Sequence, residues 1–326
     1  MIWKNIQALR AVAALMVVLA HAQAMNIIDA PIDFGRFGYS GVDIFFVISG
    51  FIICMVVERE PAPVFLARRL ARIFPLYWLV LILAAILSNW VPMAEDWMRH
   101  DPPILHLLLL TRQNRYIAPA WTLCYELYFY AVAAGILLLA PRRFFPVLAG
   151  LVVAQAAVVF LVGGPNFFTS PLILEFGMGA LAAYAAQKTA LPFGRTALLL
   201  AAAGFVGGAM WTARWVQAHG ALLPDLQRLA CFGLGSFFLV YGLASIERNR
   251  GWVLGGLWQI GGAISYAVYL LHSPILKTAR ALLPEHNPVG WAAIALILGL
   301  AWLAHIAVER PAIAAARRLR RPQSEH

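Results

Sequence analysis

The feature that most constrains this chain is a series of long apolar runs, each close to 20 residues, that recurs from the N-terminal end to about residue 308. Such a run matches the thickness of the hydrocarbon core of a bilayer, where only helices or closed barrels satisfy their backbone polar groups. The runs are continuous rather than alternating, which favours helices. Hydrophobic residues make up 62% of the chain and charged residues 12%, far from the usual balance of a soluble domain. We therefore predict an all-α integral membrane protein.

Ten of these runs are long enough to be predicted as membrane spans, with ends that we expect to shift by a few residues. Arg10 interrupts the first run, so we expect the first helix to be retained rather than cleaved as a signal. No long linker or soluble-domain composition separates the runs. We therefore predict one membrane domain over residues 1–326, a single bundle of about ten helices with a basic tail at 312–326. The predicted spans are 5–25, 41–57, 73–91, 120–140, 144–163, 171–187, 196–212, 226–246, 256–275 and 289–308.

The distribution of Lys and Arg indicates the orientation, because cytoplasmic loops of membrane proteins collect these residues. An even number of spans places both termini on one side. With both termini in the cytoplasm, seventeen of the 25 cations lie on that side. The formal charge of +10 therefore mostly reflects the cations that set the orientation in the membrane. The cations are divided among short loops, and we expect no nucleic-acid partner. The seventeen are Lys4, Arg10, Arg59, Arg68, Arg69, Arg72, Arg142, Arg143, Lys188, Arg195, Arg248, Arg250, Arg310, Arg317, Arg318, Arg320 and Arg321.

The three cysteines, Cys54, Cys124 and Cys231, all fall within predicted spans. An odd number of isolated thiols provides neither a disulfide framework nor the spacing of a metal site. We therefore expect inert thiols and no metal ion.

Ionisable groups inside a membrane are costly and usually face a cavity or a partner, so they mark candidate functional sites. In the first span, Arg10 and His21 are eleven positions apart, which is about three helical turns and about 16 Å along one face. One inward-facing stripe can hold both. The structural alternative is an arginine that reaches the inner interface and a hydrogen-bonded core histidine.

Three arginines lie at the predicted cytoplasmic mouth of the third span. Arg68 and Arg69 precede Arg72 by four and three residues, so a helix presents all three guanidinium groups within one turn of each other. Arginine makes planar, bidentate contacts with phosphate, so the cluster suits a phosphorylated ligand from the cytoplasm. An anchor that touches lipid head groups is the alternative. Tyr77 follows in the same segment and is a further candidate for this site.

A glutamate opens the fourth span among aromatic residues, between Trp121 and Tyr130. An unpaired carboxylate in an apolar helix is costly, so we expect Glu126 to meet a cation, an imidazole or a substrate hydroxyl. A buried structural pair is the alternative. The aromatic residues fit either an interfacial belt or a platform on which a sugar stacks.

The ninth span places Ser265, Tyr269 and His272 at i, i+4 and i+7, and therefore on one face. By the predicted topology, His272 lies in the outer half of the membrane, as do His21 and Glu126. These side chains form either a catalytic group or a set of hydrogen bonds between helices. Three further ionisable residues are weaker candidates: Asp43, Glu175 and His305.

Several of these residues form motifs in a fixed order: Arg10 with His21, Gly41 to Phe51 with Asp43, Arg72-Ile-Phe-Pro75, Trp121-Thr-Leu-Cys-Tyr-Glu126, Ser265-Tyr266 to His272, and Val308-Glu309-Arg310-Pro311. In order and spacing they resemble the acyltransferase 3 family from about residue 3 to about residue 311. Thr122 stands where the family has serine, and it keeps the hydroxyl. The chain is most similar to short bacterial members that modify exopolysaccharides or lipopolysaccharides. We see none of the extracytoplasmic esterase-like domain that some relatives carry.

The resemblance implies O-acyl transfer, usually of acetyl from cytoplasmic acetyl-CoA, to a carbohydrate hydroxyl at the bacterial inner membrane. The expected partners are membrane lipid, an acyl-CoA donor as co-substrate, and a glycan or lipid-linked sugar as acceptor, with no permanently bound cofactor. His21 is the expected base because imidazole titrates near neutral pH. Glu126 is expected either to orient His21 or to contact the acceptor, and Arg10 is a third candidate for the catalytic set.

The remaining candidates divide between donor and acceptor. We expect the donor CoA to meet Arg68, Arg69, Arg72 and Tyr77. We expect the acceptor to be bound or supported by Asp43, Trp121, Ser265, Tyr269 and His272.

A transporter of an anion or a lipid-linked sugar is the alternative from another class, because ten spans with intramembrane Arg, His and Glu suit it equally. The ordered motifs favour the enzyme. A non-catalytic scaffold explains neither the arginine cluster nor the buried charges.

Overall fold

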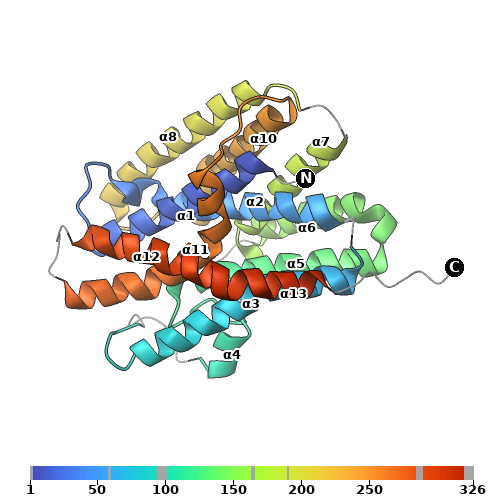
Figure 1. Cartoon of the computed structure of the whole chain (residues 1–326). Coiled ribbons are helices and arrows are strands. Elements are labelled where there is room, and N and C mark those ends of the chain that lie inside the picture. Colours follow the sequence, from blue (N-terminus) through green and yellow to red (C-terminus); the bar gives the residue numbers. More distant parts are fainter. Residues whose placement is uncertain are drawn as a thin grey trace. The chain divides into compact units, whose positions relative to one another are not determined.

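The computed structural model describes residues 3–57, 60–93, 101–162, 166–188, 191–283 and 289–318, and all regular structure in these ranges is helical (Figure 1). The α-helices are α1 Lys4–Ala24, α2 Gly41–Val56, α3 Ala62–Leu87, α4 Pro103–Leu107, α5 Trp121–Leu139, α6 Phe144–Leu161, α7 Ile173–Lys188, α8 Gly194–His219, α9 Asp225–Arg228, α10 Leu234–Arg248, α11 Leu257–Leu282, α12 Gly290–Ala304 and α13 Arg310–Arg317. The short 3-10 helices are η1 Phe34–Arg36, η2 Gly38–Ser40, η4 Ala118–Ala120, η5 Pro141–Arg143 and η6 Phe167–Thr169. The π-helices are η7 Leu229–Gly233 and η8 His305–Glu309.

Each predicted span coincides with helical structure, which confirms the all-helical prediction. Among the described residues, 8 helical segments are long and apolar enough to cross a membrane: Lys4–Ala24, Gly38–Val56, Ala62–Leu87, Ala118–Leu139, Pro141–Leu161, Gly194–His219, Asp225–Arg248 and Gly290–Arg317. The other two predicted spans are α7, which has 16 residues, and α11, whose sequence includes polar residues such as Ser265, His272 and Lys277. The number ten and the cytoplasmic termini stay predictions.

Two helices extend well beyond the predicted spans. α3 begins at Ala62 rather than near residue 73, because the arginine-rich segment is itself helical, and Pro63 lies in its first turn, where proline is tolerated. α8 continues to His219 rather than to 212 and ends where Gly220, with φ 64°, forms a left-handed C-cap.

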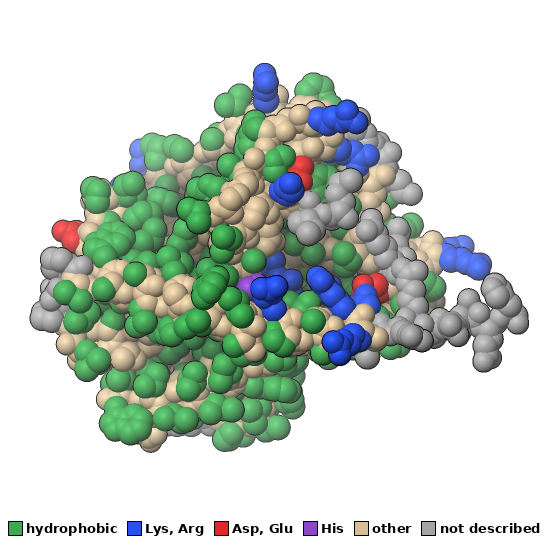
Figure 2. Space-filling model, viewed as in Figure 1, with side chains coloured by type: hydrophobic (Ala, Val, Ile, Leu, Met, Phe, Trp, Pro, Cys, Tyr) green, Lys and Arg blue, Asp and Glu red, His purple; other side chains and the backbone are tan. Residues whose placement is uncertain are grey.

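Large apolar side chains remain exposed on several of these helices. Ile82 and Ile86 on α3, and Trp302 and Leu303 on α12, are examples. Figure 2 shows hydrophobic side chains over most of the face in view, with Lys and Arg at a few places only. Such a surface is unfavourable in water and matches the hydrocarbon of a bilayer. The chain is therefore a multi-pass membrane protein.

The chain forms two compact units, each assembled from separated segments. The first unit contains Met1–Met16, Arg36–Glu60 and Gly135–Gly262, and the second contains Val17–Gly35, Pro61–Ala134 and Ala263–His326. Helices α1, α5 and α11 each contribute to both units. The single membrane domain stays a prediction.

In the first unit, α2 and α7 approach to backbone contact. A methyl group on Gly50 would lie 2.1 Å from the carbonyl oxygen of Phe176, and one on Gly179 would lie 2.0 Å from that of Val47. Small residues permit this close packing of membrane helices. The contact holds Asp43, near the start of α2, beside α7.

In the second unit, Arg68 on α3 caps the C-terminal end of α13. Its Nε donates to the carbonyl of Ala316 at 3.4 Å and its Nη2 to that of Arg317 at 3.2 Å. A cation at this end also meets the negative pole of the helix dipole. The contact ties the last described helix of the chain to the arginine-rich start of α3.

Some predictions fall outside the described residues. These are Arg59, Arg320 and Arg321 and the side chain of Lys188 in the predicted cytoplasmic set, residue 163 of the fifth span, residues 94–100 of the connection before the fourth span, and residues 319–326 of the basic tail.

Candidate active site

Two histidines of the second unit lie together. His21 is in the last turn of α1 and His272 is on α11, and their ring centroids are 4.9 Å apart with an interplanar angle of 63°. His272 is fully buried and His21 is partly exposed. The structure therefore brings together candidates from the first and ninth predicted spans, which we call the histidine pair.

Backbone hydrogen bonds orient both rings. Nδ1 of His21 is 2.8 Å from the carbonyl oxygen of Val17, and Nδ1 of His272 is 2.7 Å from that of Tyr269. A carbonyl oxygen only accepts, so Nδ1 carries the hydrogen in each neutral ring and Nε2 carries the lone pair. Within the described ranges, Nε2 of His272 has no hydrogen-bond partner. Each ring therefore has Nε2 as its basic nitrogen.

Hydroxyl groups extend the site from the histidine pair toward α5. The Tyr269 ring is 5.7 Å from that of His272, and its hydroxyl lies 3.0 Å from Oγ1 of Thr122. Both hydroxyls are within hydrogen-bonding distance of the Pro119 carbonyl, at 3.2 and 3.0 Å. The hydroxyl group of Thr122, which a serine at this position would also have, therefore takes part in these hydrogen bonds. Ser265, the third member of the predicted α11 face, is buried.

A buried lysine also belongs to this end of the site, although it is not among the predicted site residues. Lys277 on α11 is only 7% exposed, and its Nζ donates to the carbonyl of Met93 at 2.5 Å. Its positive charge acts on His21. The histidine pair therefore lies near a fixed cation, in surroundings where charge interactions are stronger than in water.

A second polar group surrounds Glu126. The Tyr130 hydroxyl donates a hydrogen bond to the Glu126 carboxylate one helical turn earlier on α5. The charges of Arg69 and Arg72 on α3 also act on Tyr130, and Arg69 lies over the ring of Phe65 at 5.8 Å. We call Arg69, Arg72, Glu126 and Tyr130 the arginine–glutamate group. These contacts place Glu126 beside Tyr130 in this group.

Tyr266 and Glu309 border the arginine–glutamate group. The Tyr266 hydroxyl donates to the carbonyl of Ile73 on α3 at 2.8 Å, and the charges of both Glu126 and Glu309 act on it. Glu309 is buried in the π-helix η8, where its Oε2 is 2.6 Å from Nδ1 of His305. π-helical turns occur frequently at functional sites, and this one brings the closing motif beside the site.

Helices α5 and α11 connect the two polar groups. Tyr266 and His272 are six residues apart on α11, about 9 Å along its axis. Thr122 and Glu126 are one turn apart on α5, about 6 Å. The histidine pair and the arginine–glutamate group are therefore separated by roughly two helical turns within one unit.

Two predicted donor ligands, Arg68 and Tyr77, also make structural contacts. Arg68 caps α13. Tyr77 is fully buried, donates its hydroxyl to the carbonyl of His106 and receives a hydrogen bond from Asn114 Nδ2 at 2.8 Å. Tyr77 therefore holds the connection between α3 and α5 in place.

Of the remaining candidates, Trp121 packs edge to face against Tyr125 at 5.9 Å. Arg10 lies in the part of α1 that belongs to the first unit and is partly buried. The described residues contain no group of three or more His, Cys, Asp or Glu side chains that could hold a metal ion.

Asp43 lies in the first unit and forms a bidentate ion pair. Nε of Arg228 is 2.9 and 3.0 Å from its two oxygens, and Nη2 is 2.8 Å from Oδ2. Nη2 also donates to the carbonyl of Tyr39 at 3.2 Å. Glu175 is fully buried beside this pair, where its carboxyl group interacts with both Asp43 and Arg228. The weaker candidates Asp43 and Glu175 thus form one buried charge cluster with Arg228.

Comparison with known proteins decides what kind of protein this is. The family model for acyltransferase 3, described as an acyltransferase domain, matches residues 3–307. The chain belongs to the acyltransferase 3 family. Membership favours the enzyme over the transporter, and it places the histidine pair and the arginine–glutamate group within the acyltransferase domain.

Two curated relatives of the acyltransferase are similar over most of their length. The exopolysaccharide production protein ExoZ of Rhizobium meliloti (strain 1021) is 31% identical over 296 residues, which cover 84% of this chain and 89% of that protein. BcsY of Komagataeibacter xylinus, whose name describes a membrane-bound transacylase, is 27% identical over 342 residues, covering 94% and 82%. No solved structure matches the chain.

Proposed function

We propose that this acyltransferase transfers an acyl group, acetyl in the simplest case, from cytoplasmic acyl-CoA to a hydroxyl of an exopolysaccharide or a related cell-surface sugar. The bacterial inner membrane is the proposed location. The observation that carries the proposal is the histidine pair, because it provides two oriented basic nitrogens in a buried site of an acyltransferase domain. The name of ExoZ supports an exopolysaccharide acceptor.

In the proposed reaction, Nε2 of His21 removes the proton of the acceptor hydroxyl. The oxygen then attacks the thioester carbonyl, the C–O bond forms and the C–S bond breaks. CoA leaves as the thiolate and takes up the proton that the histidine pair held. Positioned general bases of this kind contribute roughly 10²–10⁴-fold to a rate.

His272 is the partner of His21 in this scheme. When His21 gains a proton at Nε2, the neighbouring His272 ring offers Nε2 as an acceptor, which has no hydrogen-bond partner among the described residues. One proton can then be shared by the two rings, while the carbonyls of Val17 and Tyr269 keep both in the same orientation. His272 therefore acts as a positioning and proton-holding residue.

The donor is proposed to bind with its phosphates at Arg69 and Arg72, on the predicted cytoplasmic side. Planar guanidinium groups suit phosphate oxygens. The pantetheine arm would follow α5 and α11 past Tyr266 and Tyr269, roughly two helical turns, to reach the histidine pair. Acetyl-CoA is a co-substrate in this scheme.

The experiment that tests this function measures label transfer from [14C]acetyl-CoA into polysaccharide by membranes that contain the wild-type chain. Membranes with His21→Gln at equal protein level provide the control, since glutamine keeps a polar side chain without the basic nitrogen. We expect label in the polysaccharide with the wild type and a loss of at least about 100-fold in His21→Gln. Equal labelling by both would overturn the assignment of His21, and no transfer to any tested polysaccharide would overturn the acceptor class.

A further inference from the structure

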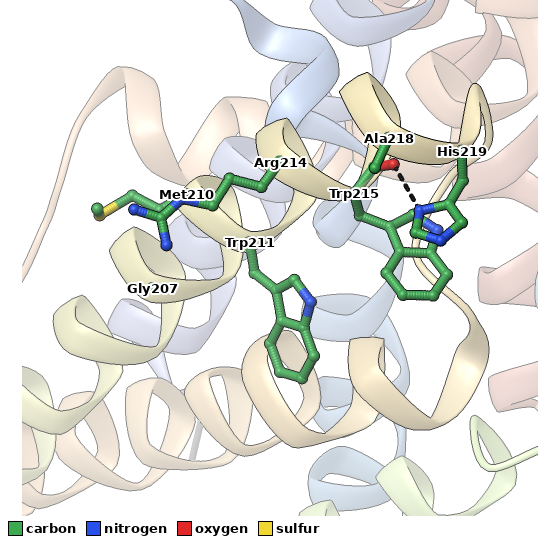
Figure 3. A pocket seen from close by; sticks show the side chains of 7 residues that line it. All are labelled: Gly207, Met210, Trp211, Arg214, Trp215, Ala218 and His219. Carbon is green, nitrogen blue, oxygen red and sulfur yellow. Dashed lines mark hydrogen bonds between the residues drawn. The ribbon is translucent and has the colours of Figure 1, made fainter.

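An open groove of about 540 Å³ runs along one face of α8 in the first unit. Figure 3 shows the side chains that line it, and all of them come from α8. The lining residues are Gly207, Met210, Trp211, Arg214, Trp215, Ala218 and His219. They recur at helical spacing, so they share one face of α8. A neighbouring face of α8 holds the buried residues Ala201, Gly208 and Thr212, and α8 packs against α10.

The spacing of two arginines places this groove in the membrane. Arg195 and Arg214 are 19 positions apart on α8, and only uncharged residues lie between them. Nineteen positions correspond to about 28 Å of helix, close to the roughly 30 Å of the hydrocarbon core. Both arginines are exposed, so each is expected at one membrane surface. Arg214 then lies at the level of the lipid head groups, on the outer side by the predicted topology.

The order of residues along the groove matches the order of groups in a phospholipid. Gly207, Met210 and Trp211 lie on the hydrocarbon side of Arg214, over about 10 Å. Met210 is 55% and Trp211 42% exposed, and a methyl group on Gly207 would meet nothing within 4 Å. Beyond Arg214, the rings of Trp215 and His219 are stacked at 3.9 Å.

The charge of the groove also favours an anion. In the described part of the chain, Arg214 has no ion pair or hydrogen bond, and no acidic side chain lines the groove. A guanidinium group that binds phosphate provides several donors in one plane. Tryptophan is enriched at this depth because its ring is amphipathic.

We propose that this groove binds the phosphate of a membrane phospholipid, with Arg214 as the phosphate ligand. The apolar end, from Gly207 to Trp211, holds the first part of an acyl chain, and Trp215 with His219 packs against the head group. The site is independent of the proposed acyl transfer, because none of its residues belongs to the polar groups of the second unit.

The test uses the purified full chain in detergent and native mass spectrometry to measure binding of phosphatidylglycerol. The variants are Arg214→Gln, Arg214→Lys and, as matched control, Gln217→Ala, which changes an exposed side chain of the same helix turn outside the groove. A cation near the membrane surface contributes about 1 kcal/mol to binding an anionic lipid. We therefore expect about fivefold weaker binding for Arg214→Gln, a smaller loss for Arg214→Lys and no change for Gln217→Ala.

Two further ligands separate the possible sources of binding. Diacylglycerol lacks the phosphate and is expected to bind the wild type more weakly than phosphatidylglycerol. Inorganic phosphate lacks the acyl chains and is expected not to displace the lipid. Equal binding of the two lipids, or of wild type and Arg214→Gln, would overturn the proposal. Displacement by inorganic phosphate would show a soluble-anion site in place of a lipid site. Melting temperatures of all variants establish that they remain folded.

Discussion

The Tyr130 hydroxyl donates a hydrogen bond to the carboxylate of Glu126, one helical turn before it on α5. Because the charges of Arg69 and Arg72 also act on Tyr130, Glu126 shares its surroundings with the proposed phosphate ligands. A carboxylate at this position compensates the arginines in the absence of donor and repels an incoming phosphate. We therefore infer that Glu126 belongs to the donor end of the proposed site.

Replacing Glu126 with Gln is expected to lower the KM for acyl-CoA. At an effective dielectric constant of about 20, a like charge about 10 Å from a phosphate costs about 1–2 kcal/mol, which is roughly tenfold in affinity. The measurement is the KM for acyl-CoA at saturating acceptor, with Tyr130→Phe as a variant that keeps the charge. A large loss of kcat with unchanged KM would instead assign Glu126 to the chemistry at His21.

Arg72→Gln is expected to weaken binding of acyl-CoA, whereas Arg68→Gln is expected to lower the stability of the protein. Loss of a charge-assisted hydrogen bond to phosphate costs about 1.5–3 kcal/mol, so Arg72→Gln should raise the KM for acyl-CoA about 10- to 100-fold. Arg68→Gln removes the cap on α13 and should lower the melting temperature with little effect on KM. Measuring both quantities on both variants tests the distinction. An equal rise in KM for Arg68→Gln would show that Arg68 also binds the donor.

The cluster of Asp43, Glu175 and Arg228 in the first unit predicts that replacing Asp43 destabilises the protein more than replacing Glu175. Asp43→Asn leaves Arg228 buried without its bidentate partner, which typically costs about 3–5 kcal/mol. Glu175→Gln should cost less, because glutamine has nearly the same size and shape and leaves the bidentate ion pair of Asp43 with Arg228 intact. Unfolding of the purified protein in detergent measures both. Strong destabilisation by Glu175→Gln, matching that of Asp43→Asn, would contradict the contrast.

His106 predicts acid sensitivity of the connection between α3 and α5. Its ring is buried and packs edge to face against Tyr116, with the ring centroids 5.7 Å apart. Burial lowers the pKa of His106, partly offset by the Asp101 carboxylate. A histidine whose folded pKa is lowered contributes full stability above its unfolded pKa of about 6.5, and this stability is lost as the pH falls below that value.

The measurement for His106 is hydrogen exchange over residues 101–117 at pH 7.5 and pH 5.5. We expect faster exchange at the lower pH in the wild type, after correction for the intrinsic rate, and no such increase in His106→Leu. Acid sensitivity that persists in His106→Leu would assign it to another group, such as Asp101.

Much of the fold follows from the sequence because the bilayer imposes a length and an apolar composition on each span. The ten predicted spans all coincide with helical structure. The start of α3 at Ala62 could not be predicted from apolar runs, because a helix rich in arginine has none. The π-helices η7 and η8 could not be predicted either. Each adds only one residue to a helical turn, so the hydrophobic pattern of the sequence hardly changes.

The partners of the polar residues were predictable only where they are close in sequence. The i, i+4 spacing of Glu126 and Tyr130 is visible in the sequence and indicates their contact. Asp43 and Arg228 are 185 residues apart, and the contact of His21 with His272 spans a comparable separation. Such pairs require the fold. From the sequence, Lys277 is predicted to lie in a loop. Nothing in the neighbouring sequence indicates that α11 continues past Pro274 to Leu282 and makes Lys277 helical.

The central claim is that His21 and His272 act as one unit in acyl transfer. Its most direct test is the rate of transfer from acetyl-CoA to polysaccharide by the wild type, His21→Gln, His272→Gln and the double variant, at equal amounts of folded protein. We predict a large loss in each single variant and no further loss in the double variant, because either substitution already removes the shared proton. Losses that multiply in the double variant, or full activity in His272→Gln, would contradict the account.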